Sequence, residues 1–268
     1  MSLYVLKLLR LILLICISLP FGIEALQVSN LACLENMMPG TRKEIQFTLI
    51  NDSDQNEEID LKLVNYSCNS EGKHFFDNLS EDIPKYPRSN GAWIHLDKKR
   101  VRLASGENKT VSYMIEVPKD QRLKGSYWSV LLIEPTDSLF MKNPSAGFNL
   151  NVKIRYAHHI VVNIGAAKPL LKIFKKEVAE IEGSHYLCLH VVNEGELFFN
   201  PSLILKLYNQ EGKLENTLKS QAERLYPGNS QCYFLKLPEN STPLTQLNGF
   251  LLFADKSNTL IGDKFSFP

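Results

Sequence analysis

Apolar and polar residues alternate with a period of two over much of this chain. The alternation is clearest at 45–50, 59–64, 111–118 and 148–156. The stretch 125–135 is instead a continuous apolar run with aromatic and β-branched residues, which predicts a buried central strand whose Trp128 fills the core. Clusters of glycine, proline and asparagine separate these segments, and helical periodicity is almost absent. The pattern predicts an all-β protein.

The second half of the chain repeats the order of signals in the first half. A strand ending at Asn51 and one ending at Asn193 are each followed by a Leu-Lys-Leu segment, and glycine-led apolar strands begin at Gly125 and Gly249. The repeat exceeds 100 residues, so it indicates domain duplication and not a solenoid with a period of about 20–50 residues. About seven short strands per half predict two tandem immunoglobulin-like β-sandwich domains. We expect them at 26–164 and 165–268.

The N-terminus is predicted to be a secretory signal peptide, residues 1–25. Lys7 and Arg10 precede the apolar run 11–19, and Ala25 offers a small residue for cleavage. The alternative is an uncleaved membrane anchor. With the segment removed, we expect no membrane insertion, and localisation in the periplasm or at the cell surface.

The remaining charge argues against one class of partner. Removal of residues 1–25 leaves equal numbers of acidic and basic residues, and the basic patches such as 98–100 are short. Nucleic-acid-binding proteins usually carry a basic excess or stripe. A nucleic-acid partner is therefore not expected.

Four cysteines remain after the signal peptide, and an even number suits an oxidising compartment. Two lie in each half, so Cys33 is predicted to pair with Cys68, and Cys188 with Cys232. The alternative is four free buried thiols, because spacing alone does not show that the Cβ atoms meet.

Signals for catalysis or for a bound cofactor are weak. His158 and His159 are adjacent, so on a strand they point to opposite faces, which suits a polar hinge better than a metal site. Cys188 and His190 share a strand face and could form half of a metal site, but Cys232 is available as a disulfide partner. No catalytic, cofactor-binding or metal-binding residues are predicted, and an enzyme is not expected.

One strand is a candidate binding element. Its apolar residues alternate with polar ones, so that one face is apolar; they are Phe148, Leu150, Val152, Ile154 and Tyr156. As the last strand of the first domain it could lie at a sheet edge and accept a strand from a partner. The alternative is that the same face packs into the sandwich core.

Several short motifs resemble the WxL-interacting surface proteins of bacteria. In the first half these are Trp93 before Leu103-Ala-Ser-Gly106, and the strand ending at Val117-Pro118. In the second half they are Asn193-Glu-Gly195 and Tyr226-Pro-Gly228. The chain is more loosely similar to periplasmic pilus-assembly chaperones, which also have two immunoglobulin-like domains behind a signal peptide.

The resemblance implies an exported, non-catalytic module that binds protein or acts as a cell-envelope scaffold. Its expected partner is another exported or surface protein. The alternative is a periplasmic chaperone that holds pilus or adhesin subunits by strand addition.

Overall fold

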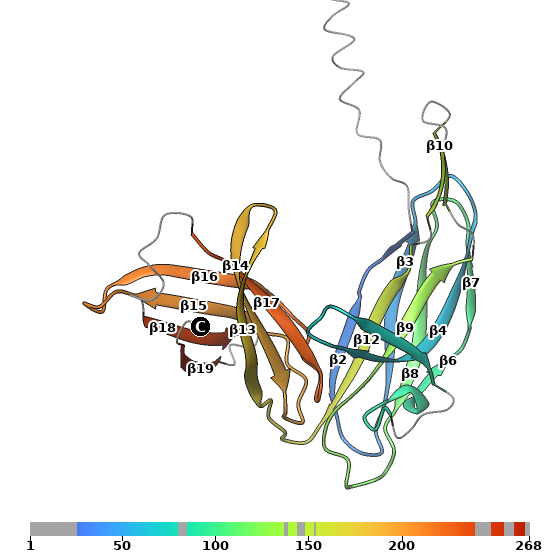
Figure 1. The fold of residues 1–268 in the computed structure, drawn as a ribbon. Helices are drawn as coiled ribbons and strands as arrows, with labels where there is room; N and C mark the ends of the chain where they lie inside the picture. The colour runs from blue at the N-terminus through green and yellow to red at the C-terminus, as the bar shows by residue number, and fades with distance from the viewer. Residues whose placement is uncertain are drawn as a thin grey trace, which may run out of the picture.

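The computed structural model describes residues 26–79, 85–136, 139–143, 148–152, 154–238, 248–254 and 260–265. The predicted signal peptide lies outside these residues. The described part consists of strands and one short 3-10 helix, η1 (Gly91–Trp93), which confirms the prediction of an all-β protein. None of its helices is long and apolar enough to cross a bilayer. Figure 1 shows two groups of sheets, named here the N-terminal lobe (26–164) and the C-terminal lobe (171–265).

The N-terminal lobe is built from two facing sheets and a separate hairpin. Its strands are β1 (Leu26–Val28), β2 (Ala32–Met37), β3 (Arg42–Asn51), β4 (Glu57–Cys68), β5 (His74–Asn78), β6 (Ile94–Leu96), β7 (Arg100–Leu103), β8 (Asn108–Glu116), β9 (Gly125–Pro135), β10 (Leu139–Asn143), β11 (Phe148–Val152) and β12 (Tyr156–Ile164). One sheet has the order β1-β3-β8-β6, and the other has the order β2-β12-β9-β4-β5, with β7 paired to β4. β9 is thus a central strand, as its apolar run predicts.

Alternation of the strands builds the core of this lobe. Both sheets contribute completely buried residues, including Leu49, Ile115, Ile133 and Ile160. Successive side chains of a strand point to opposite faces, so every second residue enters the space between the sheets. This is why the period-two segments of the sequence predicted the strands correctly.

The C-terminal lobe also has two sheets, β13-β14-β17 and β16-β15-β18-β19. Its strands are β13 (Leu171–Ile181), β14 (Ser184–Asn193), β15 (Ser202–Tyr208), β16 (Leu214–Ala222), β17 (Ser230–Lys236), β18 (Asn248–Ala254) and β19 (Leu260–Phe265). A second core of completely buried residues, among them Leu187, Leu205 and Leu235, lies between them.

Two buried asparagines give the sequence repeat a structural meaning. Asn51 Nδ2 donates hydrogen bonds to the carbonyl oxygens of Gln55, at 2.7 Å, and Ala104, at 2.9 Å. Asn193 Nδ2 likewise donates hydrogen bonds to the carbonyl oxygens of Leu197, at 2.8 Å, and Leu225, at 3.1 Å. Both asparagines have no exposed surface. Each therefore ties the end of a strand to a distant turn, in the same way in both halves.

The predicted continuous strand 148–156 is divided in the structure. Phe148, Leu150 and Val152 belong to β11, which pairs with β10 in a two-stranded sheet at one end of the N-terminal lobe (Figure 1). Ile154 lies outside any strand, and Tyr156 begins β12. The strand is interrupted because its two parts pair with different partners. The last strand of the lobe is β12, which is covered by β2 on one side and by β9 on the other.

Only part of the predicted edge therefore remains. β2 pairs only with 159–164 of β12, whereas Tyr156 pairs with Ile133 of β9, so the predicted edge at Tyr156 stays a prediction. β11 pairs only with β10 among the described strands, and its role in binding a partner stays a prediction.

Neither predicted disulfide is present, since all four cysteines are free thiols. Cys33 belongs to the core of the N-terminal lobe, whereas Cys68 lies in a second apolar cluster on the other face of the same sheet. These two side chains cannot meet through the sheet, so their predicted pairing is wrong.

Cys188 and Cys232 are closer together. In the β14–β17 register they lie opposite Phe234 and His190, respectively, which makes the two thiols diagonal neighbours. Burial raises the pKa of Cys232 to about 12, with the nearby Cys188 as the next cause. Both thiols are free in this structure, and the pairing of these neighbours stays a prediction.

Candidate functional site

The outer face of β9 packs against the C-terminal lobe. Leu131 and Ile133 point into the core of the N-terminal lobe, while Trp128, Val130 and Leu132 belong to a second buried cluster on the opposite face. That cluster also includes Tyr226 of the C-terminal lobe. Trp128 therefore fills the contact between the lobes, and the prediction that it fills the sandwich core is wrong.

Tyr226 is the centre of this contact. It is completely buried, and its ring lies 4.9 Å from that of Trp128 and 5.4 Å from that of Tyr66, centroid to centroid. Phe198 packs on it from its own lobe at 4.9 Å. Aromatic pairs with such geometries contribute about 0.5–1.5 kcal/mol each beyond the buried area. Tyr226 is the first residue of a turn through Pro227 and Gly228, which is closed by the hydrogen bond from the Asn229 N–H to the Tyr226 carbonyl at 3.0 Å.

The adjacent histidines lie on opposite faces of β12, as predicted. His158 Nε2 lies 3.0 Å from Tyr113 Oη inside the N-terminal lobe. His159 Nδ1 lies 2.7 Å from Tyr226 Oη in the contact between the lobes. Burial lowers the pKa of both imidazoles, and that of His159 falls to about 3, with the nearby Arg224 as the next cause. Both histidines are therefore neutral at pH 7, and one of them joins the lobes.

Backbone hydrogen bonds connect the start of β9 to the C-terminal lobe. The Ser126 N–H donates to the Glu196 carbonyl at 2.8 Å, and the Phe198 N–H donates to Ser126 Oγ at 2.6 Å. Gly125 has a φ of +78°, and a Cβ there would lie 2.4 Å from the Glu196 carbonyl oxygen. Only glycine lets the two backbones approach this closely. The packing of Gly125 therefore depends on the lobe contact.

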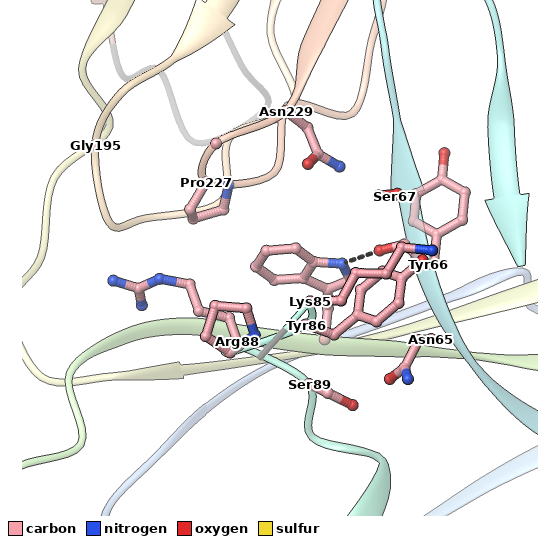
Figure 2. A pocket seen from close by; sticks show the side chains of 13 residues that line it. Asn65, Tyr66, Ser67, Lys85, Tyr86, Arg88, Ser89, Gly195, Pro227 and Asn229 are labelled. Atoms are coloured by element: carbon pink, nitrogen blue, oxygen red, sulfur yellow. Dashed lines mark hydrogen bonds between the residues drawn. The ribbon is translucent and has the colours of Figure 1, made fainter. Parts of the chain in front are cut away.

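A pocket of about 400 Å³ opens beside this contact (Figure 2). The N-terminal lobe lines it with 65–67, 85–89 and Trp128, and the C-terminal lobe with Gly195 and 227–229. The volume lies within the range of about 300–1,000 Å³ typical of small-molecule sites, which are common between domains. The pocket is the candidate functional site.

Hydrogen bonds fix the aromatic walls of the pocket. Trp128 Nε1 donates to the Tyr66 carbonyl at 2.8 Å, the bond drawn in Figure 2, and the Trp128 N–H donates to the Arg88 carbonyl at 2.9 Å. Tyr86 Oη donates to Asp77 Oδ2 at 2.5 Å. The indole and phenol rings are thus held before any ligand arrives.

Polar groups are interspersed among these walls. Asn65 is 4% exposed; its Nδ2 donates to the Asn78 carbonyl at 3.3 Å, and its Oδ1 accepts no hydrogen bond from the described residues. Ser67 and Asn229 line the pocket from opposite lobes (Figure 2). Hydroxyl and amide groups both donate and accept hydrogen bonds. They therefore suit a ligand with several hydroxyl or amide groups.

The two cations that line the pocket, Arg88 and Lys85, have carboxylate partners. Arg88 Nη2 lies 3.3 Å from Glu196 Oε1, and Lys124 Nζ lies 3.2 Å from the same oxygen. Lys85 Nζ lies 2.5 Å from Asp77 Oδ2 and lowers the pKa of that carboxyl group by a hydrogen bond. The Lys85–Asp77 pair is largely exposed and contributes little to stability, whereas the Arg88 side chain is only 24% exposed. These pairs do reduce the local positive charge.

Among the described residues, no group of three histidine, cysteine, aspartate or glutamate side chains is placed to hold a metal ion. Cys188 and His190 do lie on one face of β14, but His190 Nε2 pairs with Glu177 Oε1 at 2.8 Å.

Sequence reasoning missed this pocket. It placed the candidate site on 148–156, and none of the described residues of that segment lines the pocket. The usable signal was the Tyr-Pro pair, which occurs at Tyr86-Pro87 and again at Tyr226-Pro227. Nothing in the sequence places these two segments, 140 residues apart, at one site.

Comparison with protein families gives a partial match. Residues 35–133 match the family model described as "WxL Interacting Protein, peptidoglycan binding domain". The resemblance stated from the sequence is therefore confirmed for this stretch, which includes β3 to β8 and most of β9. No curated protein matches the chain.

Several of the solved structures to which the chain is similar are fimbrial chaperones. The class 5 fimbriae chaperone CfaA is 13% identical with a TM-score of 0.48, over 90% of this chain and 99% of that one. The CsuC–CsuE complex of Acinetobacter baumannii is 11% identical with a TM-score of 0.46, over 89% of this chain and 97% of that one. The E. coli chaperone DraB is 13% identical with a TM-score of 0.42, over 91% of this chain and 97% of that one. Similarity at this level carries no conclusion about what the chain binds.

Proposed function

We propose that this chain is an exported, non-catalytic module that binds the cell envelope through peptidoglycan. In this proposal, two tandem immunoglobulin-like sandwiches, 26–164 and 165–268, follow a cleaved signal peptide, 1–25. A surface or exported protein is the further partner expected of such a scaffold.

The observation that carries the proposal is the position of the family match. The matched stretch 35–133 belongs to a family described as peptidoglycan-binding, and it supplies Asn65, Tyr66, Tyr86, Arg88 and Trp128 to the interlobe pocket. A pocket with aromatic walls and interspersed amide and hydroxyl groups is suited to a polyhydroxylated ligand. The match and the pocket therefore support the same function.

Sedimentation with purified peptidoglycan tests this proposal. The chain without residues 1–25 is expected to pellet with sacculi stripped of protein and of attached polymers, and to stay in solution without them. Cellulose particles of equal mass are the control for non-specific adsorption. Equal recovery on sacculi and on cellulose would contradict the proposal.

The alternative is a chaperone that works by strand addition. The observation in its favour is that β11 pairs only with β10 among the described strands, which leaves its other edge available. Co-expression with candidate exported subunits tests it. Polar substitution of Leu150 and Val152 should abolish capture of a subunit while the free energy of unfolding is unchanged; unfolding of the variants would instead show that β11 has a structural role.

A further inference from the structure

We propose that the interlobe pocket is a saccharide subsite that takes an uncharged, N-acetylated sugar unit of a glycan strand, and that the two lobes form it jointly. This inference rests on the proposed function, because it names the part of peptidoglycan that is recognised and the place where it binds.

The walls of the pocket fit the two sides of a sugar ring. A pyranose has C–H faces that are apolar and an edge of hydroxyl groups. Tyr86, Trp128 and the two prolines Pro87 and Pro227 line the pocket from both lobes. Figure 2 labels Tyr86 and Pro227. The exposed part of each ring is small, 8% for Trp128 and for Tyr86, but both rings are already fixed by hydrogen bonds, so contact with a ligand costs little side-chain freedom.

Asn65 supplies a specific acceptor. Its carboxamide is buried, its amide nitrogen is used by Asn78, and its Oδ1 accepts no hydrogen bond from the described residues. Oδ1 itself has less than 1 Å² of exposed surface. A ligand N–H or O–H group therefore reaches it only after the carboxamide turns toward the pocket, and the pairing then removes the unfavourable energy of a buried acceptor without a donor. An acetamido N–H or a sugar hydroxyl is such a donor, and Ser67 and Asn229 line the same pocket.

The charges at the rim favour an uncharged ligand. Arg88 is paired with Glu196, and Lys85 with Asp77, at 3.3 and 2.5 Å. A site for phosphate or carboxylate groups would present cations that lack such partners. The stem peptides of peptidoglycan carry carboxylates, so the paired cations favour the glycan over the peptide as occupant.

The C-terminal lobe is part of the site. Gly195, Pro227 and Asn229 line the pocket opposite the aromatic walls. A sugar seated there touches both lobes, so binding stabilises the observed arrangement of the lobes by linkage. The family match ends at residue 133, so the second half of the subsite lies outside the matched stretch.

Substitution of Ser67 tests the subsite directly. Ser67 is half-buried on β4 and lines the pocket, so Ser67→Tyr places a phenol ring in the space that the sugar would occupy. Ser112→Tyr is the matched control, because Ser112 is half-buried on β8 and does not line this pocket. A second variant, Asn65→Ala, removes the acceptor. Circular dichroism and urea unfolding are measured for all three.

Two soluble probes and one polymer separate the possible outcomes. The probes are amidase-released glycan strands and isolated stem peptides, measured by calorimetry; the polymer is intact sacculi, measured by sedimentation. We expect the unsubstituted chain to bind glycan strands and sacculi. Ser67→Tyr should abolish binding to glycan strands and to sacculi, and Ser112→Tyr should change neither binding. Asn65→Ala should weaken glycan binding by about tenfold, the scale of one hydrogen bond.

The outcomes that overturn the inference differ from failure of the proposed function. Sacculi bound equally by the chain and by its folded Ser67→Tyr variant would overturn the subsite and leave the function intact. Binding of stem peptides and not of glycan strands would overturn the saccharide assignment. Absence of binding to sacculi would contradict the function itself, whereas glycan binding that is lost in Ser67→Tyr would still support the subsite.

Discussion

Tyr226 Oη lies 2.7 Å from His159 Nδ1, and this hydrogen bond joins the two lobes where both side chains are buried. Tyr226 is contributed by the C-terminal lobe, and His159 by the last strand of the N-terminal lobe. The pair lies within the aromatic cluster that includes Trp128, which also forms a wall of the pocket. The geometry of the pocket therefore depends on this bond.

Tyr226→Phe is expected to lower the free energy of unfolding by about 1–3 kcal/mol, because it leaves a buried imidazole nitrogen without its partner. Urea unfolding at pH 7 measures the change. Tyr233→Phe is the matched control: Tyr233 is also buried, in the core of the C-terminal lobe, and its Oη has no hydrogen-bond partner among the described residues. The control should be neutral or slightly stabilising, and equal losses in both variants would refute a special role for the Tyr226–His159 bond.

Stability is expected to fall as the pH is lowered from about 6.5 toward 3. Burial lowers the pKa of His159 to about 3 in the folded chain and also lowers the pKa of His158, so the unfolded chain binds more protons in this range. For each pH unit below about 6.5, each of these histidines lowers the free energy of unfolding by up to about 1.4 kcal/mol.

Urea midpoints at pH 7 and pH 5 check the sign and size of this effect. His159→Phe should flatten the dependence by removing one of the two groups. His185→Gln, at an exposed position on β14, should leave it unchanged. A steeper fall in His159→Phe than in the unsubstituted chain would contradict the assignment.

Gly125→Ala is expected to destabilise the chain more than Gly106→Ala. Both glycines have positive φ, +78° and +68°, so both substitutions incur backbone strain of about 1–2 kcal/mol. Only at Gly125 would the added Cβ collide with backbone, 2.4 Å from the Glu196 carbonyl oxygen; at Gly106 nothing lies within 4 Å.

The comparison of these two variants isolates the contact between the lobes. Overpacking at Gly125 should lower the free energy of unfolding by about 1–3 kcal/mol more than backbone strain alone. The Ser126–Glu196 hydrogen bond should also open, which faster amide exchange of Ser126 would report. Identical unfolding curves for the two variants would show that the lobes are not held together at this point.

Asn193→Ala is expected to cost about 3–5 kcal/mol, among the largest losses of any substitution in the chain. Asn193 Nδ2 donates to two carbonyl groups, and its Oδ1 accepts from the backbone N–H groups of Leu170 and Gly195. Buried groups left without partners carry a high cost. Asn209→Ala is the control, since Asn209 bridges an exposed turn in a similar way. Thermal unfolding with a smaller loss for Asn193→Ala than for the control would contradict the argument.

The strands could be predicted from sequence because the signal is local. Each side chain of a strand either enters a core or faces solvent, so the period-two pattern around Leu49 or Leu205 is visible within a few residues. The repeat was visible for the same reason, since Asn51 and Asn193 occupy equivalent strand ends.

The errors concern contacts between distant segments. Trp128 was assigned to the sandwich core because its strand is apolar on both faces, and only the presence of Tyr226 on the outer side explains why. The pairing of Cys33 with Cys68 failed because spacing does not reveal which face of a sheet a residue occupies. The segment 148–156 was one alternating pattern that two different partner strands divide.

The sequence by itself determined the all-β class, the positions of the strands around 45–50, 59–64, 111–118 and 125–135, the repeated order of its signals and the opposite orientations of His158 and His159. Each follows from backbone geometry within a few residues. The tertiary structure decided that the second face of β9 is buried by the other lobe, that Gly125 must lack a side chain, and that 65–67, 85–89 and 227–229 enclose one pocket. These depend on contacts across 100 residues or more of chain, and no local pattern of hydrophobicity encodes which distant surface will cover a given apolar face.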